Sequence, residues 1–396
     1  MKTLNAPRTE QLRHLPGPEW LASRRASAVA QLSSVSFPTE AEEIWRYSRI
    51  GSVTPSDFSA ARSAVEVLLP DDAVAAGVQV RRAVAFDVDP IGAPLIDDAC
   101  DAVTLVGASV LTDVVVIDVP PGAVAATPIH IRHHLQADGA VIGTRLVIRS
   151  GPNSDVTVIE RTTSDDVATL LIPITELHLD AAARLRFVSV QELGRRVVQL
   201  GMLSSRSEKD STLTTIAVAL GGSYARMRTD STLTGRGAHS EMLAVYFGDE
   251  AQMHDFRTIQ SHISPNATSD LLFKGGVKDR ARSVYSGLIR IGPDARGTVA
   301  NQANRNLLLS AEASAESVPN LEIENNDVKC SHASAVGPID EDHLYYLESR
   351  GVPSDVAERL VVIGFFADLL DRVPEDSLRA DLIDAVRMKF DKGASR

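Results

Sequence analysis

Residues 181–187 read AAARLRF and residues 208–214 read EKDSTLT, and these two stretches define the pattern of the central chain. In each, small or turn-forming residues are followed by a short segment in which apolar and polar residues alternate, as in a strand with one buried face. Comparable breaks recur at Pro121-Gly122, Gly151-Pro152, 181–183, 208–210, 235–237, 264–266 and Gly292-Pro293. The steps between breaks are about 27 to 31 residues long, which predicts a repeating β architecture.

Two all-β architectures compete for this pattern. A sandwich has turn signals about every 8–12 residues. A β-helix has short strands, few aromatic residues and small residues at its corners, because each coil stacks on the next. Aromatic residues make up only 5% of the 396-residue chain, and Gly, Ala and Ser recur at the breaks, so the sequence favours a β-helix.

Helical patterns flank this core, which is expected at residues 121–337. Residues 1–70 are expected to be partly helical, with a helix over Glu19–Leu32 and a short one carrying Ile44, Trp45 and Tyr47 after a capping box of Thr39 and Glu42. Residues 71–120 form a small α/β segment with strands expected at Val78–Phe86, Val103–Val106 and Val114–Val119. Residues 338–396 are expected to form three helices, the first ending at Gly351 and the second carrying an apolar stripe from Val356 to Leu370.

Composition excludes several classes of protein. The chain has 40 Lys and Arg against 52 Asp and Glu, a formal net charge of −12, which argues against nucleic-acid binding. Its two cysteines, Cys100 and Cys330, are too few for a disulfide framework or a four-cysteine metal site within one chain. The polar start MKTLNAPRTEQ and an apolar stretch of only Leu360–Leu370, about half the length of a membrane span, predict a cytoplasmic protein without membrane contact.

The familiar catalytic signatures do not occur. Lys274 and Lys278 lie outside a phosphate loop, and neither a G-x-S-x-G elbow nor an H-E-x-x-H zinc motif occurs. The histidines at 130, 133 and 134, and those at 254 and 262, are expected to be structural. A β-helix enzyme acting on carbohydrate or acyl substrates stays open as an alternative, but its candidate carboxylates, Glu241, Asp255, Asp270 and Asp279, show no paired spacing.

Cys330-Ser331-His332 is the sharpest chemical feature. Residues i and i+2 of a strand project to the same side, so this thiol and imidazole could both address one iron or zinc ion. Two ligands are too few for a tight site. A metal here would therefore need further ligands from elsewhere or from another chain.

The stretch from His254 to Gly364 resembles the SufB/SufD family of iron–sulfur cluster assembly proteins. The resemblance rests on MHDFRTIQSHISPNATSDLLFKGGVKDRARSVYSGLIRI, on NQANRNLLLSAEASAESVPNLEIENNDVKCSHASAVGPID and on EDHLYYLESRGV followed by IGFF, with FPTEAEEIWRYSRI as a weaker N-terminal match. Within the family the chain is similar to SufD, because 301–304 lacks the cysteine of SufB-type chains and the motif reads K-C-S-H. Ala333 departs from the usual glycine.

This resemblance implies a right-handed parallel β-helix and a non-catalytic scaffold subunit. The implied partners are a SufB-like subunit and a SufC-like ATPase, with a homodimer possible in isolation. His332, with Cys330 as a less certain neighbour, would contribute to a transient cluster shared with the SufB-like chain, and no cofactor would be bound tightly by this chain alone. The ATPase would meet the helix that carries Leu360, Ile363, Phe366 and Leu370.

Overall fold

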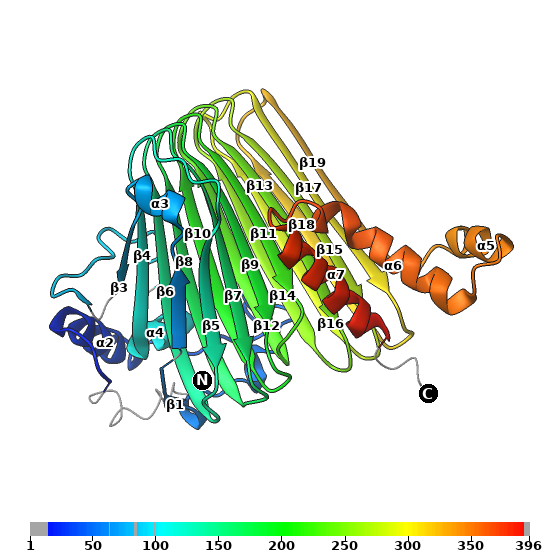
Figure 1. Ribbon diagram of the computed structural model, residues 1–396, viewed down its shortest axis with the longest axis horizontal. Helices are drawn as coiled ribbons and strands as arrows, with labels where there is room; N and C mark the ends of the chain where they lie inside the picture. The colour runs from blue at the N-terminus through cyan, green and yellow to red at the C-terminus, as the bar shows by residue number, and fades with distance from the viewer. Residues whose placement is uncertain (1–14, 63, 83–84, 99, 392–396) are drawn as a thin grey trace.

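Two long parallel sheets face each other along the molecule and form one flattened solenoid of about eight turns (Figure 1). The computed structural model describes residues 15–62, 64–82, 85–98 and 100–391. Successive strands alternate between the two sheets, so each turn of the solenoid contributes one strand to each. The predicted β-helical core is confirmed. Within the described ranges, no helix combines the length and apolarity that crossing a membrane requires.

The even-numbered strands form one sheet and most odd-numbered strands the other. The first sheet contains β3 (Gln79–Arg82), β4 (Leu111–Val119), β6 (Ala140–Ser150), β8 (Thr169–Leu179), β10 (Val198–Ser207), β12 (Tyr224–Leu233), β14 (Met253–His262), β16 (Arg282–Ile291) and β18 (Ser314–Ile323), with β1 (Ser59–Ala60) beside β6. The second contains β2 (Ala64–Leu68), β5 (Ile129–Leu135), β7 (Asp155–Ser164), β9 (Arg184–Glu192), β11 (Thr212–Ala219), β13 (His239–Gly248), β15 (Thr268–Val277), β17 (Thr298–Leu308) and β19 (Val328–Gly337).

The coils stack in register, and the length of a coil varies between neighbours. Val198 of β10 pairs with Tyr224 of β12, 26 residues later, whereas Arg282 of β16 pairs with Ser314 of β18, 32 residues later. These lengths bracket the period read from the sequence. The parallel stack begins at β4, so the solenoid starts at Leu111, ten residues before the expected boundary at 121.

One corner of the solenoid carries a residue in the left-handed conformation once in every coil. These residues, with φ between 55° and 72°, are Gly122, Asn153, Ala182, Asp210, Gly237, Asn266 and Gly297. Each donates its backbone N–H to a carbonyl at the same corner of the following coil, as in Asn153 to Ala181 (3.1 Å), Ala182 to Lys209 (2.8 Å) and Asp210 to Arg236 (3.0 Å). The breaks found in the sequence are therefore these corners.

The outer faces of the two sheets are covered by different parts of the chain. Trp45, Ile50 and Val53 of the N-terminal segment pack on the even-numbered sheet against residues such as Leu170 and Leu200. The elements of this segment are α2 (Glu19–Leu32), the 3-10 turns η1 (Glu43–Trp45), η2 (Ile50–Ser52) and η3 (Pro55–Asp57), α3 (Asp71–Ala75) and α4 (Ala102–Ser109).

The N-terminal predictions are confirmed in part. The helix over Glu19–Leu32 forms with those bounds, and the backbone N–H of Thr39 donates to Glu42 (3.0 Å), but only the 3-10 turn η1 follows. The strand expected at Val103–Val106 is wrong, because this segment lies in helix α4, begun by a capping box of Asp101 and Thr104. A short, wholly buried apolar run has no periodicity that separates strand from helix. The strand expected at Val78–Phe86 shortens to β3, residues 83–84 lying outside the described residues.

Three C-terminal helices follow the solenoid: α5 (Glu341–Ser349), α6 (Ser354–Leu370) and α7 (Asp376–Asp391). Helices α6 and α7 cross the outer face of the odd-numbered sheet, while α5 projects beyond the end of the solenoid (Figure 1). Phe366 packs on Phe247 of β13, with ring centroids 6.3 Å apart. Lys389 fixes the end of α7 by donating to the carbonyl of Leu220 (2.7 Å) and to Gln252 (2.6 Å).

The corner conformation predicts opposite effects for the same substitution at adjacent positions. Ala182 has a φ of 58°, which strains any residue with a Cβ, whereas Ala181 is not in the left-handed region. Ala182→Gly should therefore raise the free energy of unfolding by about 0.5–1 kcal/mol, and Ala181→Gly should lower it by a similar amount through the more flexible unfolded chain. Urea denaturation of both variants checks this, and equal destabilisation would contradict it.

Candidate functional site

Cys330 and His332 lie on the same face of β19, the last strand of the odd-numbered sheet, as their spacing predicts. Cys330 pairs with buried Ala300 of β17 and packs with Ile289 and Ile291, so it faces the interior. Ser331 faces the opposite way, since its hydroxyl donates to exposed Asn301 on the outer face (2.7 Å). His332 therefore projects to the interior side, and it is exposed because no further coil covers it.

Polar side chains lie directly beneath this pair on β17. Gln302 is the ladder neighbour of His332, and Asn304 is the neighbour of Ser334. Asn304 donates to the hydroxyl of Tyr246 (2.9 Å) and accepts from Asn306 (2.7 Å), so it belongs to a closed hydrogen-bond network. The sequence analysis examined 301–304 only for a missing cysteine. The i, i+2, i+4 spacing of Gln302, Asn304 and Asn306 was the signal that these amides share the interior face.

Two glycines make room for this interior. A Cβ on Gly275 would overlap the ring of Tyr246, and a Cβ on Gly287 would overlap the hydroxyl of Tyr285 and lie 2.7 Å from the Gln302 amide nitrogen. Tyr285 and Tyr246 stack with Phe256 and Phe273 in the interior, where Tyr285 shares a hydrogen bond with Thr258 (3.1 Å). The K-G-G and Y-S-G motifs are thus explained by close packing.

The site does not hold a metal set of its own among the described residues, where no group of three or more His, Cys, Asp or Glu side chains converges on a point. Burial raises the pKa of the Cys330 thiol, and a hydrogen bond with the backbone of Ala300 lowers it by less. The thiol is therefore mostly protonated at neutral pH, and a metal or another charge must help it to ionise.

The other predicted histidines are fixed by intramolecular contacts. His254 and His262 are buried, and they donate or accept with the carbonyl of Phe247 (3.3 Å) and the hydroxyl of Ser269 (2.9 Å). His133 lies 3.2 Å from Glu160 in the interior, while His130 contacts Glu375 (3.0 Å) and His134 contacts Asp165 (3.3 Å).

The candidate carboxylates lie apart, each with its own partner. Asp255 is buried between Arg226 (3.0 Å) and Arg257 (2.6 Å), Glu241 accepts from Arg372 (2.7 Å), Asp270 accepts from Asn301 (2.9 Å) and Asp279 accepts from the backbone N–H of Glu250 (2.9 Å). These contacts form no pair of facing carboxylates.

Asp255 is instead the centre of an ionic contact that the sequence analysis missed. The Arg226 guanidinium lies 3.8 Å from the Trp45 ring centroid and donates to the carbonyl of Ile44 (3.0 Å), and Arg257 donates to the carbonyl of Arg46 (2.6 Å). The E-I-W-R and H-D-F-R segments therefore meet in space. Their joint occurrence, far apart in the chain, was the available signal.

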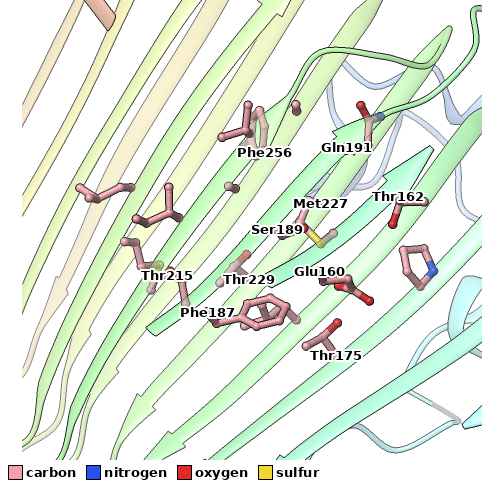
Figure 2. A pocket seen from close by; sticks show the side chains of 18 of the residues that line it. Glu160, Thr162, Thr175, Phe187, Ser189, Gln191, Thr215, Met227, Thr229 and Phe256 are labelled. Carbon is pink, nitrogen blue, oxygen red and sulfur yellow. The ribbon is translucent and has the colours of Figure 1, made fainter. Parts of the chain in front are cut away.

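The interior also contains a cavity of about 60 Å³ between the two sheets (Figure 2). Glu160, Phe187 and Thr215 line it from the odd-numbered sheet, and Thr175 and Met227 from the other. Small-molecule sites are usually about 300–1,000 Å³, so this space is too small to be one.

The four residues expected to meet an ATPase divide between two faces of α6. Phe366 and Leu370 are buried against the odd-numbered sheet, where they hold the helix in place. Ile363 is partly buried beside them, and Leu360 is 51% exposed. Tyr345 of α5 is 73% exposed, and no residue of α5 is buried.

The family model for the SUF system FeS cluster assembly SufBD core domain matches residues 133–365. This chain belongs to the SufBD family. The match begins well before the segments on which the resemblance was based and includes β19 with Cys330 and His332. The chain is therefore involved in SUF iron–sulfur cluster assembly.

Individual relatives agree with this assignment. A SufBD family iron–sulfur cluster assembly protein of Mycobacterium leprae is 35% identical over 280 residues, which cover 68% of this chain and 70% of that protein. A SufBD family protein of Mycobacterium tuberculosis is 36% identical over 224 residues, 54% of this chain and 56% of the relative. SufD of Escherichia coli is 30% identical over 186 residues, 47% of this chain and 44% of that protein.

Burial of two histidines predicts a loss of stability in mild acid. Burial lowers the pKa of His254 to about 3 and that of His262 to about 4, whereas both titrate near 6.5 in an unfolded chain. Below pH 6.5 the unfolded chain binds more protons, so the free energy of unfolding should fall toward pH 4, by up to about 1.4 kcal/mol per pH unit for each histidine.

Urea denaturation between pH 7.5 and 4.5 measures this slope. His262→Gln should flatten it, and His343→Gln, at an exposed position on α5, should leave it unchanged. An unaltered slope in the His262 variant would show that His262 does not cause the loss.

Proposed function

We propose that this chain is a SufD-type scaffold subunit that pairs with a SufB-type subunit and presents His332 to a nascent iron–sulfur cluster at their interface. The observation that carries the proposal is the position of Cys330 and His332 on the interior face of the last strand, at an uncovered end of the solenoid. The printed names of the E. coli and Bacillus subtilis relatives, both SufD, support the subtype.

The last coil is suited to receive a partner. Strands β18 and β19 each pair with a strand on one side only, so their other edges present free backbone donors and acceptors. Leu321, Ile323 and Val336 of these strands are each about 40% exposed. A second solenoid that stacks on this end would continue both sheets and bury these residues. In isolation the same edges would allow a homodimer.

A shared cluster explains why this chain has so few ligands. Iron–sulfur clusters are held mainly by cysteine thiolates, and this chain offers one cysteine and one histidine at the site. The SufB-type subunit would supply the remaining thiolate ligands. Iron and sulfide are cargo in this scheme, which leaves the chain a cytoplasmic, non-catalytic subunit without a tightly bound cofactor.

The C-terminal helices would bind a SufC-type ATPase, which would supply the ATP hydrolysis. Leu360 and Tyr345 are exposed apolar groups on two helices that pack on each other. Phe366 and Leu370 support this surface from beneath by anchoring α6 to the solenoid. Ile363 lies between the two roles. The alternative of a β-helix enzyme gains no support, since its candidate carboxylates serve separate contacts.

Removing the imidazole tests the role of His332. His332→Ala should lower the iron and sulfide bound by the complex with SufB-type and SufC-type partners at least about tenfold, as expected for loss of a ligand to a shared site. Anaerobic purification of the complex, with iron and sulfide assays and size-exclusion chromatography, measures cluster yield and assembly separately. His343→Ala, a nearby exposed histidine on α5, is the matched control. Normal cluster yield in the His332 variant would overturn the assignment.

The two faces of α6 predict different effects for the same charge. Leu360→Asp should weaken association with the ATPase about tenfold or more while the melting temperature stays unchanged, because the side chain is exposed. Phe366→Asp should lower the melting temperature, because it places a charge in the contact with Phe247. Calorimetric titration and thermal melting separate the two effects. Met388→Asp, an exposed apolar position on α7, should bind normally; equal loss there would argue against a specific surface.

A further inference from the structure

Gln302 has a buried carboxamide that the chain itself leaves unpaired. Its side chain is 2% exposed, and neither its amide oxygen nor its amide nitrogen has a hydrogen-bond partner among the described residues. An unpaired buried amide is unfavourable, because it loses its hydrogen bonds to water without replacement. Such a group in the interior beside a functional residue calls for a partner that arrives with a ligand or a change of rotamer.

The neighbours of Gln302 on the interior side are already engaged. The hydroxyl of Tyr285 shares a hydrogen bond with Thr258, and Asn304 is committed to Tyr246 and Asn306. Gly287 lies against the amide nitrogen and offers no side chain. The remaining direction is toward β19, where the ladder neighbour of Gln302 is His332.

The exposed imidazole of His332 has the complementary need. It projects to the same side as Gln302 from the adjacent strand, about 5 Å away in a sheet. A histidine that binds a metal through one ring nitrogen usually donates the N–H of the other to a carbonyl or carboxylate, which fixes the tautomer and the ring plane. The carboxamide oxygen of Gln302 is a carbonyl acceptor at the required place.

We infer that Gln302 is a positioning residue for His332: its amide oxygen accepts the N–H of one imidazole nitrogen and leaves the other nitrogen free to bind iron. The inference rests on the proposed function for the identity of the metal, but the imidazole–carboxamide contact belongs to this chain alone. Gln302 acts through His332 and does not bind iron itself. It also explains why the strand before the last coil carries a buried amide at this position.

The direct test measures the tautomer of His332 in the full-length chain. With ¹⁵N-labelled histidine, two-bond nitrogen–proton correlation at pH 8 separates the neutral tautomers, and the spectrum of His332→Ala assigns the signal. In Gln302→Leu the tautomer ratio of His332 should change at least about threefold, toward that of exposed His343, as expected for loss of one hydrogen bond. Gln302→Glu, which keeps an acceptor oxygen, should retain the original ratio.

The matched control is Gln260→Leu. Gln260 is likewise buried and unpaired within the described residues, but it lies on β14, and its neighbour on β16 is Ile289. This variant should leave the His332 ratio unchanged even if it alters stability. An unchanged ratio in Gln302→Leu, or an equal change in both variants, would overturn the inference.

Cluster assembly in the complex separates this inference from the proposed function. Gln302→Leu should reduce bound iron and sulfide, and adding it to His332→Ala should cause no further loss, because both changes act on one ligand. A normal cluster yield in His332→Ala would refute the proposed function, while the tautomer ratio would still decide on the contact. A normal yield in Gln302→Leu beside a low yield in His332→Ala would refute the positioning role alone.

Discussion

The hydrogen bonds at the left-handed corner are the constraint on which the solenoid depends. Each coil must reverse direction in a few residues, and one residue with φ near 60° does this while its N–H reaches the next coil. Because the bond joins equivalent corners, it fixes where each coil begins relative to its neighbour. The strands between corners then pair in register even where one coil has 26 residues and another 32. The variable length is absorbed elsewhere in the coil.

Register at the corners determines the chemistry at the end of the solenoid. A shift of one residue on β19 would turn Cys330 and His332 outward and bring Ser331 inside, since side chains alternate along a strand. The corner bond from Gly297 to Asp327 (2.6 Å) lies just before this strand and opposes such a shift. The contact of Ser331 with Asn301 on the outer face opposes it as well. The uncovered end therefore has a defined set of interior side chains although nothing is stacked upon it.

The sequence predicted the repeat because corners need particular backbone conformations, and these leave Gly, Asn, Asp and Ala at regular intervals. It also predicted the shared face of Cys330 and His332, which follows from alternation alone. It could not predict that Val103–Val106 is helical, because a fully buried run such as α4 has no polar face to reveal its period. Nor could local patterns show that Phe366 faces inward and Leu360 outward, since α6 is apolar on most of its surface and its orientation is set by Phe247 and its neighbours on the sheet.

The interior of the last two coils differs from that of the others in a way that favours partnership over self-sufficiency. Deeper in the solenoid, aromatic rings fill the space between the sheets, and a closed network satisfies Tyr246, Asn304 and Asn306. At Gln302 this closure stops, and above it the only chemistry is a thiol, an imidazole and two open strand edges. A solenoid that was complete in itself would end in a polar cap that pairs its last strands. This one carries its helices on the side of the sheet, and so its end remains available for the subunit that completes the site.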